Sequence, residues 1–125
     1  MPDGDEPKRV KKYTVKLTDG YYTGEWLGEK RDGMGTLIEP FGNRYEGQWS
    51  NDKMNGQGKL TKPNGDVCDG QWVDDKFHGM GTWISHKGTK YVGQFIEDSL
   101  SGQGIMTYPD GSRYEGNFLE VKKDG

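Results

Sequence analysis

Apolar and polar residues alternate with a period of two in short segments along this chain, and turn residues separate the segments. In "YEGQW" at 45–49, Tyr45, Gly47 and Trp49 would point to one side of a strand, and the residues between them to the other. The segment "GQGKL" at 56–60 alternates in the same way. The pattern therefore predicts β-strands of about five to seven residues.

Turn sequences connect these strands. In "PNGD" at 63–66, proline presets the first turn dihedral, asparagine tolerates the next, and glycine takes the positive φ that closes a hairpin. On the other side, "SNDKMN" between Trp49 and Gly56 predicts a polar loop of six residues. Each unit therefore supplies two antiparallel strands.

The unit repeats at a fixed interval of 23 residues. Segments like "YEGQW" begin at residues 22, 45, 68, 91 and 114, which we number units 1 to 5. The blocks "GMG" or "GQG" begin at 33, 56, 79 and 102, and the turns at 40, 63, 86 and 109. Such a repeat predicts stacked units. With the last unit cut short, it predicts nine or ten strands in one meander.

Glycine is unusually abundant, at 21 of 125 residues. If the two alternating sets share a side of the sheet, each aromatic ring lies beside strand positions that carry no side chain. The glycines cost backbone entropy, but they leave a flat floor for Tyr and Trp rings. Ring contacts along the stack would add about 0.5–1.5 kcal/mol each.

The pattern Y-x-G-x-W, a loop, G-x-G and a glycine turn resembles the MORN repeat (membrane occupation and recognition nexus) over about residues 20–125. This resemblance implies an all-β fold, a single-layer twisted antiparallel sheet of stacked hairpins, elongated, with a groove along one face. It also implies an adaptor or scaffold role, often in cytoskeletal and ciliary assemblies. Lipid binding has been proposed for the family.

Several positions depart from the repeat. Cys68 stands where other units begin with tyrosine, Trp83 stands at a leucine or methionine position, and His86 replaces the turn proline. The turn glycine before unit 1 comes one residue late, which argues against a regular lead-in strand. The sequence stops at Gly125, so we expect unit 5 to lack its second strand and to leave a sheet edge open.

Composition narrows the class of protein. Only 30% of residues are hydrophobic, against roughly 45–50% in an average domain, which disfavours a two-layer sandwich. The 12% of aromatic residues, spread evenly, argues against disorder. No run of about 18 apolar residues and no signal-peptide core occur. A single cysteine favours a reducing, cytoplasmic location.

Charge divides the chain into two parts. Residues 8–16 hold five cations and no acid, whereas residues 17–125 hold 12 basic and 17 acidic residues. We therefore expect a flexible basic arm over 1–16 and a repeat domain over 17–125. The arm offers Lys8, Arg9, Lys11 and Lys12 to anionic lipid or an acidic partner, or is merely solvated. The net charge of −3 argues against nucleic acid as a partner.

No catalytic signature is found. G-x-S-x-G, Walker A and G-x-G-x-x-G motifs are all missing from the sequence. Glu46, Asp69 and Glu115 recur at one repeat position on the face away from the rings, so we expect them to be solvated. Cys68, His78 and His86 lack zinc-ligand spacing. We expect no enzyme activity, cofactor or metal.

The aromatic columns are the strongest candidates for a binding site. A single-layer sheet has no second layer to cover its rings, so we expect them to be partly exposed in a groove. Exposed apolar strips usually mark partner sites, and a helix or extended peptide suits a groove. The candidate groove residues are Tyr22, Trp26, Tyr45, Trp49, Trp72, Trp83, Tyr91, Phe95, Tyr114 and Phe118.

The sequence thus favours a non-catalytic protein-binding adaptor or scaffold subunit, and the resemblance points to a cytoskeletal or ciliary (axonemal) assembly. Open sheet edges would also permit end-to-end self-association. Two alternatives stay open. One is a peripheral module that binds anionic membranes through the basic arm. The other is a regulatory partner of a separate enzyme, since such repeats also occur beside kinase and methyltransferase domains.

Overall fold

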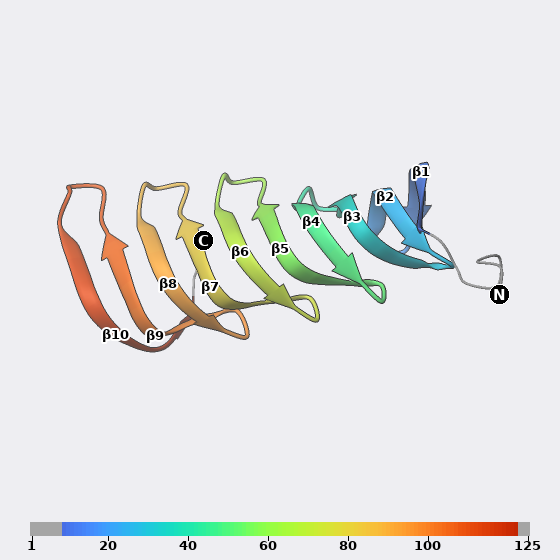
Figure 1. Cartoon of the computed structure of the whole chain (residues 1–125). Coiled ribbons are helices and arrows are strands. Elements are labelled where there is room, and N and C mark those ends of the chain that lie inside the picture. The colour runs from blue at the N-terminus through green and yellow to red at the C-terminus, as the bar shows by residue number, and fades with distance from the viewer. Residues whose placement is uncertain (1–8, 123–125) are drawn as a thin grey trace.

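The computed structural model describes residues 9–122, which form ten β-strands and, within that range, no helix. The strands pair antiparallel in chain order as one sheet (Figure 1). The strands are β1 (Arg9–Leu17), β2 (Gly20–Leu27), β3 (Lys30–Ile38), β4 (Arg44–Ser50), β5 (Lys53–Thr61), β6 (Val67–Val73), β7 (Lys76–Ile84), β8 (Lys90–Ile96), β9 (Ser99–Thr107) and β10 (Arg113–Lys122). The predicted all-β, single-layer architecture is confirmed.

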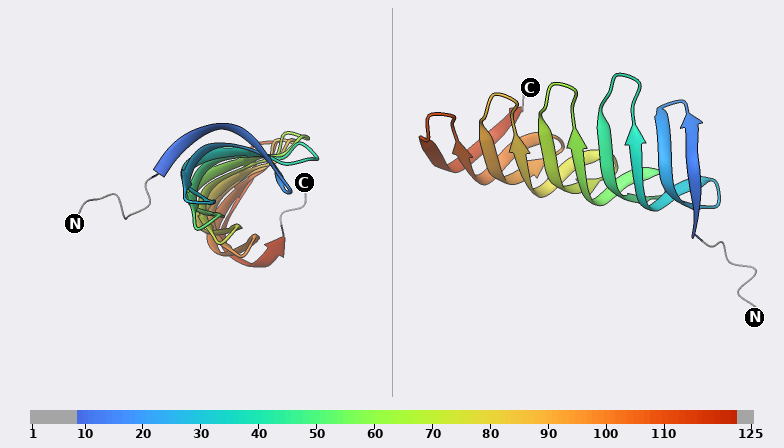
Figure 2. Two further views of the ribbon diagram at one scale, coloured as in Figure 1. Left: turned by 90° about the vertical axis from the view of Figure 1, so that its right-hand side faces the viewer. Right: turned by 90° about the horizontal axis from the view of Figure 1, so that it is seen from above.

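The sheet is elongated across its strands and curved along them. Viewed end on, it forms an arc, and viewed from above, the hairpins follow one another in a row (Figure 2). Turns lie along two edges. The long-turn edge carries the turns at 39–43, 62–66, 85–89 and 108–112, and the short-turn edge carries those at 28–29, 51–52, 74–75 and 97–98.

The long turns have the predicted hairpin chemistry. In the first of them, the Gly42 N–H donates to the Glu39 carbonyl at 2.9 Å, and the Glu39 N–H donates to the Asn43 carbonyl at 2.8 Å. Gly42 has a φ of 98°, the left-handed conformation that glycine adopts without steric cost. Pro40 follows Glu39, where its fixed φ suits the turn.

The short turns are tighter than predicted. The expected six-residue loop "SNDKMN" is wrong, because β4 runs to Ser50 and β5 begins at Lys53. Asn51 and Asp52 form the whole connection, with φ values of 53° and 71°. Two successive positive φ values match the twist of a hairpin, and Asn and Asp tolerate them.

The strand register confirms that the two alternating sets share one face. Tyr45 pairs with Leu60, and Gly47 pairs with Gly58. Between Gly47 and Trp49 the register shifts at a β-bulge, and equivalent shifts recur in units 1, 3 and 4. A bulge bends its strand and increases the local twist. The repeated bulges therefore give the sheet its arc.

The sheet begins earlier than the sequence suggested. The prediction of a flexible arm is wrong for residues 9–16, and so is the argument against a lead-in strand. These residues belong to β1, which pairs with β2 from Arg9↔Leu27 to Leu17↔Gly20. The late glycine is accommodated because residues 18–19 form a short turn and Gly20 opens β2. The first eight residues of the proposed arm lie outside the described range.

Candidate functional site

The aromatic side chains of one face, which we call the ring face, form a continuous ladder through the sheet. Neighbouring ring centroids lie between 4.3 Å (Phe77–Phe95) and 5.4 Å (Tyr45–Trp72) apart. Most neighbours meet edge to face, the arrangement that the ring quadrupoles favour. The order along the ladder is Trp26, Tyr22, Trp49, Tyr45, Trp72, Phe77, Phe95, Tyr91, Phe118 and Tyr114.

The rings are not exposed in a groove, so that expectation is wrong for eight of the ten candidates. Those eight are buried, and even the most exposed of them, Trp83, shows only 8% of its surface. Tyr114 is 47% exposed, and Phe118 is partly buried. The buried candidates are Tyr22, Trp26, Tyr45, Trp49, Trp72, Trp83, Tyr91 and Phe95.

The bend of the strands explains this burial without a second layer. Tyr22 and Trp26 are four residues apart, so their Cα atoms in a straight strand would be about 13 Å apart. Their ring centroids are only 5.1 Å apart. A strand that bends toward its rings brings them together, and each ring then covers its neighbours. We infer that the ring face lines the inner side of the arc.

The glycine floor predicted from the sequence is confirmed. A Cβ atom added to Gly58 would lie 2.2 Å from the Tyr45 hydroxyl oxygen and 2.3–2.4 Å from carbons of its ring. A Cβ atom added to Gly35 would lie 2.2–2.4 Å from the Tyr22 side chain. These distances are too short for any side chain, so the second glycine of each G-x-G block is required by the ring that lies on it.

Each ladder tyrosine is also fixed through its hydroxyl. The hydroxyls of Tyr22 and Tyr45 donate to the carbonyls of Glu25 and Gln48 at 2.7 and 2.8 Å. Burial raises the pKa of Tyr22 to about 12, although the nearby Arg31 opposes the rise. Burial likewise raises the pKa of Tyr45. These phenols therefore stay protonated at neutral pH and act as structural donors.

Phe77 belongs to the ladder although the sequence analysis missed it. It is fully buried, and a Cβ atom on Gly81 would lie 2.4 Å from its ring. In unit 3 it thus takes the floor that a tyrosine at residue 68 would occupy. The available signal was the 23-residue column of positions 31, 54, 77 and 100, which holds Arg, Met, Phe and Leu.

Arg31, in the same column, is a second buried residue that the sequence analysis missed. Its guanidinium contacts Asp52 at 2.7 Å and Asp19 at 2.9 Å, and it lies over the Trp49 ring, 4.6 Å from the centroid. The hydrogen bond from Arg31 lowers the pKa of Asp52. A charge at this core position is therefore compensated on every side by carboxylates and an aromatic face.

Recurring polar side chains of the repeat accept hydrogen bonds from backbone N–H groups of the chain. The side chains of Gln48, Gln71 and Gln94 accept bonds from backbone N–H groups at the bulges, at 2.6–2.8 Å. The turn aspartates Asp52, Asp75 and Asp98 accept bonds from N–H groups of the preceding unit, at 2.8–3.1 Å. Both sets recur in successive units, and the aspartates join one unit to the next.

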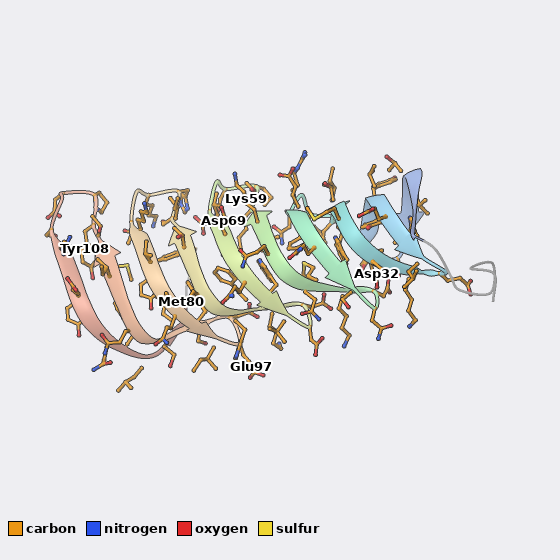
Figure 3. The ribbon with its side chains drawn as sticks, viewed as in Figure 1. Asp32, Lys59, Asp69, Met80, Glu97 and Tyr108 are labelled. Carbon is orange, nitrogen blue, oxygen red and sulfur yellow. The ribbon has the colours of Figure 1, made fainter. Side chains whose placement is uncertain are left out.

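The remaining candidates are not brought together into a chemical site. Glu46 lies on the exposed face and forms an ion pair with Arg44, and Asp69 lies opposite Lys59 in the register of β6 and β5 (Figure 3). His78 accepts the Glu97 N–H at 3.2 Å, whereas His86 contacts Asp66 at 2.7 Å. Among residues 14–119, whose side chains the structure describes, no cluster of three or more His, Cys, Asp or Glu side chains could hold a metal.

The basic candidates are only partly placed. Lys8 lies outside the described range, and Arg9, Lys11 and Lys12 belong to β1. Their contact with lipid or an acidic partner stays a prediction. In the part of the chain that the structure describes, no helix has the length and apolar character needed to cross a membrane.

A single-layer sheet of stacked hairpins, held by a ring ladder, defines an all-β repeat protein. The MORN repeat family matches residues 22–38, 45–67, 68–90 and 91–113, and the chain belongs to this family. MORN repeats are non-catalytic modules that bind proteins or membranes. A comparison with curated protein sequences gives no match.

Proposed function

We propose that this chain is a non-catalytic adaptor that docks a helix or extended peptide of another protein on its ring face. The supporting observation is a set of apolar side chains that pack on the ladder and stay partly uncovered. They are Leu17, Met54, Leu60 and Phe118, together with Val15. No second layer covers them among the described residues.

The burial of the rings changes how such docking works. The partner contacts these partly uncovered apolar residues and the ring edges between them, rather than bare Trp and Tyr faces. Because the side chains of the ring face are already packed, they lose little conformational entropy on binding, which favours affinity. We propose a cytoplasmic setting for this adaptor, in a cytoskeletal or ciliary assembly, and the family resemblance supports this proposal.

A face-specific cross-linking experiment tests the proposal. A photoreactive amino acid replaces Leu60 on the ring face or, as the matched control, its neighbour Lys59 on the exposed opposite face. We expect Leu60 to cross-link a defined protein segment in cells and Lys59 not to do so. Moderate salt leaves an apolar contact largely unchanged. Equal labelling from both faces contradicts the proposal, as does binding to phosphatidylserine vesicles in place of protein.

A further inference from the structure

The face opposite the rings carries an apolar patch over β7–β9, which we call the outer patch. It consists of Met80, Ile84, Val92, Ile96 and Ile105. Met80 is 53% exposed, and Val92 is 40% exposed. Val92 lies directly opposite Ile105 on the neighbouring strand, so the patch is continuous across β8 and β9.

The repeat does not require Val92 and Ile105 to be apolar. The position of Val92 holds Glu46, Asp69 and Glu115 in other units, and the position of Ile105 holds Lys59 in unit 2. The cross-strand pair Val92–Ile105 thus replaces the charged pair Glu46–Lys59. Met34 and Ile38 of unit 1 are also exposed on this face, but an apolar cross-strand pair at these two positions occurs only in unit 4 among units 1 to 4.

The surface beside the patch is hollowed. A cavity of about 450 Å³ is lined by Gln57, Asp69, Gln71, Met80, Thr82 and Val92. A second cavity of about 280 Å³ lies against Met80 and Ile96. Met80 lines both hollows and is 53% exposed, so a complementary surface would contact it at either one.

Charge is distributed unequally at the two ends of these strands. Near the long-turn edge lie Lys87 and Lys90, with Asp110, and Arg113, which is ion-paired with Glu115 at 3.0 Å. At the short-turn edge lie Asp74, Asp75, Glu97 and Asp98, with Lys76. Glu97 and Tyr108 mark these two edges in Figure 3. The patch therefore lies between a basic and an acidic border.

We infer that the outer patch pairs with the outer patch of a second copy of this chain, face to face. A two-fold axis across the strands reverses the strand direction of the second sheet. The basic border of each copy then faces the acidic border of the other, twice per dimer. An axis along the strands would instead oppose like charges. Charge complementarity thus selects the occupant and its orientation.

The curvature sets the strength of this contact. The ring face lines the inner side of the arc, so the outer patch lies on the convex side. Two convex surfaces touch along a narrow band, and small interfaces are transient. The dimer therefore forms and dissociates with concentration. It leaves the ring face free, so it is independent of the proposed adaptor function.

Sedimentation analysis of the purified chain over a wide concentration range tests this. We expect the average mass to rise from one chain toward two. The variant Val92→Glu with Ile105→Lys installs the charged pair of unit 2, which this fold already accommodates. We expect its association constant to fall by about tenfold or more.

The matched control puts the same charges at the same repeat positions outside the patch, as Thr23→Glu with Thr36→Lys in unit 1. We expect its association to equal that of the parent chain. A parent chain that stays monomeric throughout overturns the inference, and so does a control that weakens association as much as the patch variant does.

Charge reversal tests the orientation. Lys87→Glu with Lys90→Glu gives a chain with two acidic borders, and Asp74→Lys with Glu97→Lys gives one with a more basic short-turn border. We expect each variant to associate less than the parent, and an equal mixture to recover association. Failure of the mixture to recover overturns the inference, whereas ring-face cross-linking would be unaffected.

Discussion

Phe77 fills the place in the ring ladder that Cys68 leaves empty. In unit 2, Tyr45 lies on Gly58 and contacts Trp72. In unit 3, Phe77 reaches the equivalent floor from the next strand. Its ring centroid lies 5.0 Å from that of Trp72 and 4.3 Å from that of Phe95. Two departures from the repeat thus compensate each other, and the ladder runs unbroken through the middle of the sheet.

Replacing Phe77 alone should break the ladder. Methionine is the natural choice because Met54 holds the same repeat position in unit 2. Phe77→Met removes two ring contacts and leaves unit 3 without an aromatic residue at this point. We expect the free energy of unfolding to fall by about 1–3 kcal/mol, measured by urea denaturation.

The double variant Cys68→Tyr with Phe77→Met recreates the unit 2 arrangement and should recover most of that loss. The converse change, Met54→Phe in unit 2, adds a ring where Tyr45 already fills the floor. The resulting overpacking should destabilise the folded chain. A double variant less stable than Phe77→Met would refute the compensation.

Gly58 should tolerate no side chain. The Cβ atom of Gly58→Ala would lie 2.2 Å from the Tyr45 hydroxyl oxygen, so the ring must move. We expect a loss of about 1–3 kcal/mol in the free energy of unfolding, from calorimetry or denaturation.

A double-mutant cycle with Tyr45→Leu is the control. Without the ring, Gly58→Ala should cost little, because alanine also restricts the unfolded chain. An equal cost of Gly58→Ala in both backgrounds would show that Tyr45 is not the reason for this glycine.

The strands, the faces of their side chains and the long turns could be predicted because their determinants are local, whereas the pairing of the faces was an assumption that the register bears out. Alternation in "YEGQW" sets the faces, and the glycine of "PNGD" sets the hairpin. The 23-residue period then extends one hairpin to the whole sheet. For the same reason the ladder candidates were correctly placed on one face.

The exposure of those rings could not be predicted in this way, because it depends on how strongly the strands bend. That bend follows from the bulge between Gly47 and Trp49, which alternation alone does not reveal. The buried positions Phe77 and Arg31 keep the alternation of β7 and β3. They were missed because they fall in the segments of units 3 and 1 that correspond to the expected six-residue loop, so their strands were predicted to begin later. The sequence therefore predicted correctly which face carries the rings, but the prediction that the rings are exposed was wrong.

The turn aspartates should contribute more to the free energy of unfolding than their exposure suggests. Asp75 has a φ of 71°, and its carboxylate accepts the Met54 N–H at 2.8 Å. Asp75→Ala removes this bond between units and places alanine in a left-handed conformation. We expect a loss of about 1–3 kcal/mol by denaturation. Asp75→Asn, which keeps an acceptor oxygen and tolerates the turn, should lose clearly less; equal losses would contradict this role.

Asp66 and His86 form a second compensating pair, between adjacent long turns. Asp66 is fully buried, and its Oδ1 accepts the His86 N–H at 2.7 Å and lies 2.7 Å from His86 Nδ1. In the preceding pair of turns, Asn43 and Pro63 hold these positions. Because proline has no N–H, the buried carboxylate of Asp66 depends on the replacement of proline by histidine.

His86→Pro should therefore destabilise the chain by about 3–5 kcal/mol at pH 7, since it leaves a buried carboxylate without its donors. Adding Asp66→Asn restores the Asn–Pro pair of the preceding turns and should recover most of the loss. If the double variant is as unstable as His86→Pro alone, the loss arises from proline in the backbone and not from Asp66.

The pH dependence of stability separates these variants further. Burial raises the pKa of Asp66, but the hydrogen bonds from the His86 backbone and ring outweigh it, so the pKa lies below its ordinary value. A lowered pKa means that ionised Asp66 stabilises the fold above its ordinary pKa of about 3.9. This stability is lost as the pH falls through the folded-state pKa.

In His86→Pro the effect of burial dominates, so the pKa of Asp66 is raised rather than lowered. Acidification toward pH 4 should therefore stabilise that variant relative to the parent. Unfolding free energies measured between pH 7 and pH 3 test this, and parallel profiles would rule out the pairing of Asp66 with His86 as the cause.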